Sequence, residues 1–513
     1  MKKLPIGKQE FKGLIEDGCI YVDKTQYLLK LVEATSPVFL SRPRRFGKSL
    51  MLNTFKELFK GDKSLFIDTY AYNHWDFSQN HPVIQLDLSI VTGNTVDVIG
   101  QKLLAIVKGV AEQLNIELAS TEFADLAFDE LIRKAALTAP VVLLIDEYDT
   151  PVLENIQNPA LDEIKSLLRG FYKIIKANER FIRFTFITGI SKFTHVGVFS
   201  ALNHLQDITL DDDYANITGY SENEIRTFFK PQIVQIQQSN NLSEPEFWQK
   251  LAHYYNGYSW DGQHFVYNPI SILKFLANKG EFIPYWMETG SPEFILRYSQ
   301  DKKFNIMDFE QKRVQRTFLN RREIDSASAE SFLTQAGYLT IKAKDEDSYT
   351  LDFPNNEVRR SFCELILSAQ YQVQDDDLFD VKYALKQAFK SQDIDEVIKQ
   401  FKIIFSSIPY VLFDSNKTEH FYSALLLMYM QAAGFDATPE RLGNKGRLDL
   451  SIKFEQDIYI FELKTDSADK ALKQIIEKNY AGAYQNLNVT LIGLQIDFQE
   501  RNIVNTATQR PNR

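Results

Sequence analysis

The stretch VFLSRPRRFGKSLMLNTFKELF (residues 38–59) decides the fold of the N-terminal part of the chain. It begins with a short apolar run typical of a buried strand and continues, after a basic loop, into an amphipathic helical pattern. Gly47, Lys48 and Ser49 lie where the loop meets the helix. Such a loop directs backbone N–H groups at phosphate oxygens, while the lysine reaches the β- and γ-phosphates and the serine ligates Mg²⁺. The stretch therefore predicts a phosphate-binding loop for ATP or GTP.

This loop departs from the usual pattern of phosphate-binding loops. Arg42 stands where the first glycine is expected, and Pro43 removes a backbone donor. Three arginines, Arg42, Arg44 and Arg45, could supply compensating charge or bind a neighbouring surface. The sequence leaves both roles open, and Arg45 is retained as a candidate nucleotide ligand.

A second stretch, VVLLIDEYD (residues 141–149), supplies the other half of such a site. Asp146 ends an apolar strand and suits a ligand of a Mg²⁺-bound water. Glu147 follows it as a carboxylate that orients or deprotonates the attacking water. A further strand in FIRFTFITGISK (residues 181–192) ends at Thr188, a candidate polar sensor of the γ-phosphate or the water. Two separate motifs thus predict ATP binding.

Short apolar runs alternate with helical patterns over residues 1–220, which predicts a parallel α/β sheet. Strands are expected at 37–41, 82–89, 140–146 and 181–188, and helices at 48–60, 95–115, 124–137 and 160–178. Residues 221–375 predict a helical lid and, over 330–362, a small winged-helix-like unit. Residues 380–513 predict a third, α/β domain. Three domains fit a chain of 513 residues.

Composition, charge and cysteine spacing exclude several classes of protein. A net charge of −10 excludes a polybasic nucleic-acid coat, although a local basic groove remains open. No apolar run approaches the roughly 20 residues that cross a bilayer, so we expect a cytoplasmic protein without a membrane partner. Cys19 and Cys363 lie far apart, which excludes a zinc site of the usual spacing. The oligomeric state stays open, a homo-oligomer included.

The third domain contains a hairpin pattern, GRLDLSIKFEQDIYIFELK (residues 446–464). Apolar and polar residues alternate on both strands, and a two-residue turn at 455–456 places Asp449 opposite Glu462. Carboxylates that face each other repel unless a cation lies between them, which favours a divalent metal. Lys464 follows on the same face and can stabilise the negative charge that develops during phosphodiester cleavage.

Other residues could complete that site. Glu419, on an upstream helix, is a candidate third carboxylate ligand, and Gln474, Lys478 and Tyr480 could hold a substrate backbone. The alternative is a surface hairpin on which Glu462 pairs with Lys464 or Arg447 without a metal.

Together these motifs resemble a known family. YVDKT (residues 21–25), the arginine-rich loop, VVLLIDEYDTPV (141–152), YNGYSW (255–260) and VYNPISIL (266–273) are similar to the prokaryotic AAA-ATPase-like family with a C-terminal PD-(D/E)XK nuclease domain. The resemblance implies an ASCE-type nucleotide-binding core, on which Lys48, Ser49, Asp146 and Glu147 match the motif positions. It also implies a restriction-endonuclease-like domain, with Asp449, Glu462 and Lys464 at its core positions and Glu419 as a looser match.

We therefore predict an ATP-dependent protein in which the N-terminal ATPase regulates or powers a C-terminal nuclease that uses Mg²⁺ or Mn²⁺. DNA is favoured over RNA as the substrate. The alternative is a nucleotide-driven molecular switch whose C-terminal domain binds nucleic acid or protein without cutting it.

Overall fold

The computed structural model describes residues 2–120, 122–192, 205–286, 306–320, 328–409, 418–439, 450–484 and 487–510. The chain divides into two compact units: Met1–Tyr285 with Gln311–Asn355, and Trp286–Glu310 with Asn356–Arg513. The sequence pattern assigned the helix that begins at Asn356 to a middle region, whereas this helix groups with the C-terminal unit. The division into three domains stays a prediction.

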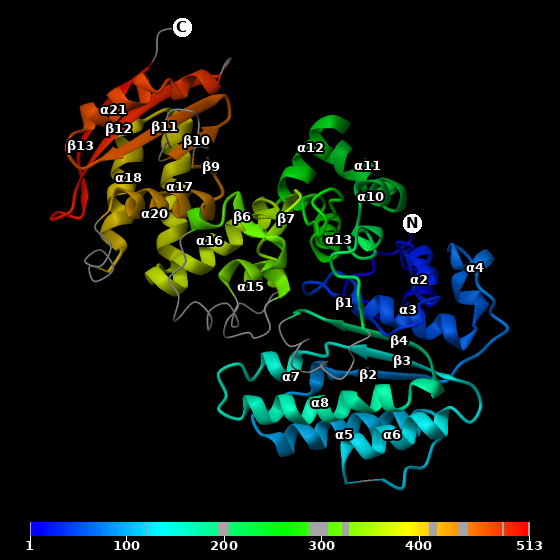
Figure 1. Cartoon of the computed structure of the whole chain (residues 1–513). Helices are drawn as coiled ribbons and strands as arrows, with labels where there is room; N and C mark the ends of the chain where they lie inside the picture. The colour runs from blue at the N-terminus through cyan, green and yellow to red at the C-terminus, as the bar shows by residue number, and fades with distance from the viewer. Residues whose placement is uncertain are drawn as a thin grey trace. The chain divides into compact units, whose positions relative to one another are not determined.

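A five-stranded sheet forms the centre of the first unit, in the order β2-β3-β4-β1-β5 (Figure 1). All its neighbouring strands are parallel. The strands are β1 (Val38–Ser41), β2 (Val83–Asp87), β3 (Val141–Asp146), β4 (Ile182–Gly189) and β5 (Gln206–Asp207). The first four confirm the predicted strands, because apolar runs buried on both faces suit a parallel sheet. β4 lies between β1 and β3, so the strand before the phosphate loop and the strand ending in Asp146 are not neighbours.

Helices cover both faces of this sheet (Figure 1). One apolar core joins a face of the sheet to α5, α6 and α8, and a second core joins the other face to α1 through α4. The bounds are α1 (Phe11–Glu16), α2 (Thr25–Leu31), α3 (Lys48–Lys60), α4 (Ala71–His74), α5 (Val96–Gln113), α6 (Ala124–Ala135), α7 (Thr150–Leu153) and α8 (Leu161–Ala177). The four helices predicted between the strands are confirmed as α3, α5, α6 and α8.

The rest of the first unit is a helical region and a small antiparallel sheet. Four helices pack around a shared apolar core that includes Ile20 and Val22 of the N-terminal segment. They are α10 (Glu222–Phe228), α11 (Lys230–Ser239), α12 (Glu244–Tyr255) and α13 (Pro269–Ala277). Helix α15 (Ala329–Ala336) precedes a three-stranded sheet, β6-β8-β7, made of β6 (Lys312–Gln315), β7 (Thr340–Lys344) and β8 (Ser348–Asp352). The sequence did not predict β6, whose residues KRVQ are mostly polar.

The second unit contains a mixed sheet in the order β13-β12-β11-β10-β9 (Figure 1). Only β11 and β12 are parallel among its described pairs. Its elements are α16 (Asn356–Tyr371), α17 (Asp375–Ser391), α18 (Ile394–Ser407), α20 (Glu419–Ala432), α21 (Ala468–Glu477), β9 (Asp436–Thr438), β10 (Leu450–Phe454), β11 (Asp457–Lys464), β12 (Asn488–Asp497) and β13 (Asn502–Gln509).

Helices lie on both faces of this second sheet as well. Ile475 of α21 packs with Ile458 and Ile460 on one face. On the other face, Phe389 of α17 packs against Tyr459, with ring centroids 4.9 Å apart. Side chains of β11 therefore alternate between two covered faces, and Glu462 belongs to the face that α21 covers. No helix in the described ranges of the chain is long and apolar enough to cross a membrane.

Candidate functional site

The loop between β1 and α3 lies at the edge where the carboxyl ends of the parallel strands meet. Gly47, the residue before α3, has a φ of 89°, a left-handed conformation that favours glycine. Because Gly47 is the N-cap and has no side chain, the first N–H groups of α3 lack a side-chain cap and remain for an anion. Ser49 lies in this first turn and is half-buried. The start of α3 is therefore left without a side-chain cap, and phosphate binding at this loop stays a prediction.

Lys48 is buried beneath this loop. Its Nζ donates to the carbonyl oxygens of Arg42 at 2.9 Å and Pro43 at 3.0 Å. Burial lowers the pKa of Lys48, and the carboxylates of Glu147, Asp146 and Asp149 act in the opposite direction. The ammonium is thus held inside the loop by two neutral acceptors, which phosphate oxygens would replace with stronger, charged ones.

Asp146, Thr188 and Glu147 meet at the ends of β3 and β4. The Thr188 hydroxyl donates to Asp146 Oδ1 at 2.5 Å, and both residues are buried. Glu147 has a φ of 49°, a left-handed conformation that is uncommon for a residue with a side chain. Its Oε2 accepts a hydrogen bond from the Thr150 hydroxyl at 3.2 Å. The structure thus brings three predicted residues into one cluster, with Thr188 as the partner that orients Asp146.

Asp149 belongs to the same cluster and was missed by the sequence reasoning. It is fully buried and accepts hydrogen bonds from the backbone N–H groups of Ile190 at 3.1 Å and Ser191 at 2.7 Å. It thereby fixes the chain that follows Thr188. Burial raises its pKa to about 6. A signal was available, since VVLLIDEYD contains a third carboxylate beside apolar residues.

Replacing Asp149 with asparagine tests this buried carboxyl. Because the pKa of Asp149 is raised to about 6 from 3.8, the folded chain binds more protons than the unfolded chain between about pH 4 and 6. The wild type should lose up to about 3 kcal/mol of unfolding free energy as the pH rises through this window. Asp149→Asn does not titrate, so its stability relative to the wild type should rise from pH 4 to 6 and then level off. Melting curves from pH 4 to 8 measure this, and a constant difference would contradict it.

The three arginines of the loop divide between interior and surface. Arg42 is fully buried, whereas Arg45 is exposed and has a φ of 69°. Partial burial and the neighbouring charge of Arg44 lower the pKa of Arg45. Arg42 is therefore an internal residue of the loop, and the role of Arg45 toward a nucleotide stays a prediction.

In the second unit, Glu462 and Lys464 lie on the same face of β11. Glu462 is 1% exposed, and its Oε1 lies 3.8 Å from Lys464 Nζ. The same ammonium lies 3.4 Å from Oε2 of Glu419, the first residue of α20. Glu419 Oε1 also accepts from the N–H of Thr465 at 2.8 Å. The structure therefore gathers three of the predicted nuclease residues, with a cation between two carboxylates.

Helix α21 closes over Glu462. The Gln474 side chain of α21 donates a hydrogen bond to Glu462 Oε1. Gly493 of β12 pairs in register with Glu462, and a Cβ at Gly493 would lie 2.2 Å from the carbonyl oxygen of Ala468 in α21. Only a glycine lets the helix come this close to the sheet. Gly493 thereby allows the contact between Gln474 and Glu462.

The predicted register of the hairpin is confirmed. Leu450 pairs with Phe461, Ile452 with Tyr459 and Phe454 with Asp457. Asp449, the predicted partner of Glu462, lies outside the described residues, so their pairing stays a prediction. Within the described ranges, which omit 440–449, no group of three His, Cys, Asp or Glu side chains is arranged to hold a metal ion.

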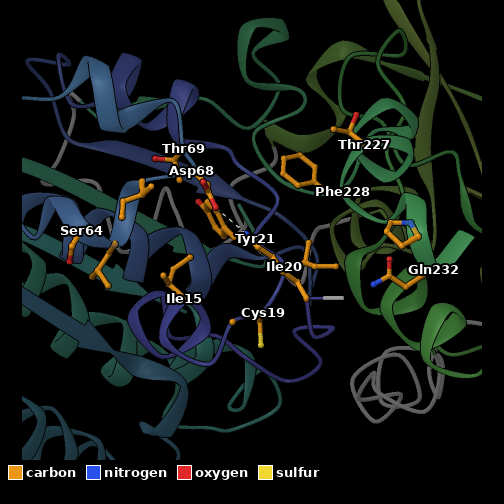
Figure 2. A pocket seen from close by; sticks show the side chains of 15 residues that line it. Ile15, Cys19, Ile20, Tyr21, Ser64, Asp68, Thr69, Thr227, Phe228 and Gln232 are labelled. Atoms are coloured by element: carbon orange, nitrogen blue, oxygen red, sulfur yellow. Dashed lines mark hydrogen bonds and ion pairs between the residues drawn. The ribbon is translucent and has the colours of Figure 1, made fainter.

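A cavity of about 450 Å³ lies in the first unit apart from the phosphate loop (Figure 2). Its lining includes Tyr21 of the N-terminal segment, Asp68 from the turn beyond α3, and Phe228 and Gln232 at the junction of α10 and α11. Ser64 and Leu65, which follow the C-terminal end of α3 in the chain, also line the cavity, and the 13 residues of α3 span about 20 Å. None of the predicted site residues lines it.

Comparison with known proteins gives two domain matches and a full-length relative. Residues 5–199 match the family described as "Predicted AAA-ATPase", and residues 417–506 match the PD-(D/E)XK nuclease superfamily. The "Uncharacterized protein in vnfD 5'region" of Azotobacter chroococcum mcd 1 is 34% identical over 532 residues, which cover 98% of each protein. A solved structure, the Aeropyrum Pernix ORC2 protein (ADPNP-ADP complexes), is 10% identical with a TM-score of 0.27 and covers 71% of this chain and 93% of that chain.

The two matches occur in the order in which the structure places the parallel sheet and the mixed sheet. Since a relative is 34% identical along 98% of its length, the chain belongs to the predicted AAA-ATPase-like family, with a C-terminal domain of the PD-(D/E)XK nuclease superfamily.

Proposed function

We propose that this protein binds and hydrolyses ATP in its first unit and cleaves nucleic acid, DNA in the first instance, in its second unit with Mg²⁺. The observation that carries the proposal is the pair on β11, where a buried Glu462 carboxylate lies 3.8 Å from Lys464 Nζ. A buried carboxylate and a lysine on one strand face suit phosphodiester cleavage. The cluster around Lys48 supports nucleotide binding in the first unit.

In the first unit, the chain's own residues supply phosphate binding and water activation. Lys48 would exchange its two carbonyl acceptors for oxygens of the β- and γ-phosphates, and the first N–H groups of α3 would bind the same phosphates. Ser49 and Asp146 would hold Mg²⁺, which neutralises charge that develops on the phosphates. Glu147 orients the attacking water and accepts its proton, while the Thr188 hydroxyl keeps Asp146 in place.

In the second unit, the donor set fits a hard cation. Lys464 Nζ lies 3.4 Å from Glu419 and 3.8 Å from Glu462, so the described carboxylates already stabilise a positive charge between them. Glu462 and Asp449 would hold Mg²⁺ or Mn²⁺, with Glu419 as a further oxygen donor. A bound metal polarises the scissile phosphate and activates a water. Lys464 stabilises the negative charge on the phosphate, and Gln474 fixes the orientation of Glu462.

The test uses purified full-length protein and supercoiled plasmid DNA, with Mg²⁺ or Mn²⁺ or with chelator, and with or without ATP. We expect metal-dependent nicking whose rate depends on ATP, measured as conversion of supercoiled to open-circular DNA. A single-stranded RNA of matched length in parallel reactions separates the two substrate classes. Binding without cleavage under every metal condition would overturn the nuclease activity in favour of a molecular switch. The homo-oligomer and the cytoplasmic location stay predictions.

A further inference from the structure

Arg42 is an unusual residue for a phosphate-binding loop, because its side chain points into the protein. It is 0% exposed, and its guanidinium donates to the carbonyl oxygens of Ser41 at 2.9 Å, Thr209 at 2.7 Å and Tyr214 at 3.3 Å. No carboxylate among the described residues lies within ion-pair distance of it, and its Nε has no acceptor among them. The described groups in direct contact with this buried cation are therefore neutral, while the charges of Asp207 and Asp261 lie beyond ion-pair distance and favour its charged form.

The largest of these neutral groups is the ring of Trp260. The Arg42 guanidinium lies 4.0 Å from the centroid of this ring, and Trp260 is 8% exposed. A second loop residue, Phe46, packs edge to face against Tyr258 and Trp260, with ring centroids 4.8 and 5.3 Å apart. The aromatic residues Tyr258 and Trp260 are thus packed against the phosphate-binding loop.

The segment that carries Trp260 is fixed from its other side. The N–H of Ser259 donates to the Thr340 hydroxyl at 2.7 Å, and that hydroxyl donates to the carbonyl oxygen of Ser259 at 2.9 Å. Gly262, with a φ of 75°, lies so close to Ala343 of β7 that a Cβ would meet its backbone at 2.9 Å. Residues 259–262 are therefore packed against β7, which fixes the position of the segment that contacts the phosphate-binding loop.

Arg42 links this support to the nucleotide-binding groups. Its carbonyl oxygen accepts from Lys48 Nζ at 2.9 Å, while its guanidinium lies over Trp260. Phe46, the other loop residue on Trp260, directly precedes Gly47 and α3. In this loop, which lacks the usual first glycine, the packing of Arg42 and Phe46 against Trp260 therefore fixes the position of the backbone.

We propose that Trp260 is a positioning residue for the phosphate-binding loop. Trp260 holds Arg42 and Phe46 in place, so that Lys48 and the first turn of α3 face the triphosphate. The proposal rests on the proposed ATP binding of the first unit. Trp260 does not touch the nucleotide in this arrangement. It acts through Arg42 and Phe46, and its loss leaves a loop whose position is no longer fixed.

The chain offers a matched control. The Arg226 guanidinium lies 3.8 Å from the centroid of the Trp248 ring, and Trp248 is 7% exposed. That arginine also pairs with Glu222 at 2.7 Å and Glu244 at 2.8 Å, away from the loop. Both tryptophans are therefore buried under an arginine in the same unit, and only Trp260 contacts the phosphate-binding loop.

The experiment compares full-length wild type with Trp260→Leu, Trp260→Phe and Trp248→Leu. Isothermal titration gives the Kd for ATP with Mg²⁺, phosphate release gives KM and kcat, and thermal melting reports stability. Trp260→Leu should bind ATP about tenfold more weakly. Trp260→Phe should recover most of this loss, because phenylalanine keeps a ring face for Arg42. Trp248→Leu should lower the melting temperature and leave the Kd within about twofold of the wild type.

Intrinsic fluorescence gives a second readout that does not depend on the leucine variant folding. ATP should change the tryptophan emission of the wild type and of Trp248→Phe, and this change should be absent in Trp260→Phe. An emission change that persists in Trp260→Phe, or a wild-type Kd in Trp260→Leu, would overturn the inference alone. An equal loss of affinity in Trp248→Leu would overturn it as well. A wild type that binds neither ATP nor GTP would overturn the proposed function and the inference with it.

Discussion

Lys48→Ala is expected to weaken ATP binding by about 10- to 100-fold, because it removes a charge-assisted contact to the phosphates. The lysine is already buried and oriented by the carbonyl oxygens of Arg42 and Pro43, so little ordering is needed when ATP binds. Glu147→Gln should behave differently. It keeps the shape of the side chain and the phosphate contacts, so binding should persist while turnover falls by about 10²- to 10⁴-fold, the usual effect of removing a general base.

Titration of the two variants with ATP and Mg²⁺, together with phosphate release, separates binding from turnover. Lys56→Ala is a suitable control, since Lys56 lies on the same helix α3 but two turns beyond the loop. It should bind ATP like the wild type. Unchanged ATP binding in Lys48→Ala, or a common loss in all three variants, would count against the assigned roles.

Local patterns were sufficient to predict the parts of the fold that are defined by neighbouring residues. The strands ending at Ser41, Asp146 and Gly189 followed from apolar runs. The hairpin register followed from strict alternation around a two-residue turn, and the pairing of Leu450 with Phe461 confirms it. In both cases the signal lies in residues that are close in sequence, either as an apolar run or as an apolar pattern that repeats with a fixed period.

Contacts between distant segments could not be predicted in this way. Neither Arg42 nor Trp260 carries a local signal for the other, and their contact depends on how the segment around Trp260 packs on β7. Asp149 likewise acts on the N–H groups of Ile190 and Ser191, which belong to another strand end. Strand β6 was missed because a short polar strand has no clear periodicity. Residues whose roles depend on tertiary packing are the ones that sequence reasoning left out.

At the C-terminal site, Glu462→Gln is expected to abolish cleavage, because it removes a buried metal-binding charge. Bound Mg²⁺ or Mn²⁺ should raise the melting temperature of the wild type, since a ligand that binds only the folded state stabilises it. Glu462→Gln should lose this rise. Asp449→Asn should lose it as well if Asp449 faces Glu462 as predicted, and in chelator it should be no less stable than the wild type, because the repulsion is relieved.

Lys464→Ala separates metal binding from catalysis at the same site. It leaves the carboxylates of Glu462 and Glu419 in place and removes the ammonium that lies 3.8 and 3.4 Å from them. The melting rise with metal should therefore persist or grow, while cleavage falls by about 10²- to 10³-fold, as for other groups that stabilise charge in the transition state. Glu477→Gln is the control, because Glu477 is an exposed carboxylate of α21 paired only with Lys473 among the described residues. Melting curves and plasmid cleavage in chelator, Mg²⁺ and Mn²⁺ distinguish the variants. A wild type whose melting temperature is the same in chelator and in metal would argue that Glu462 and Lys464 form an ion pair and nothing more.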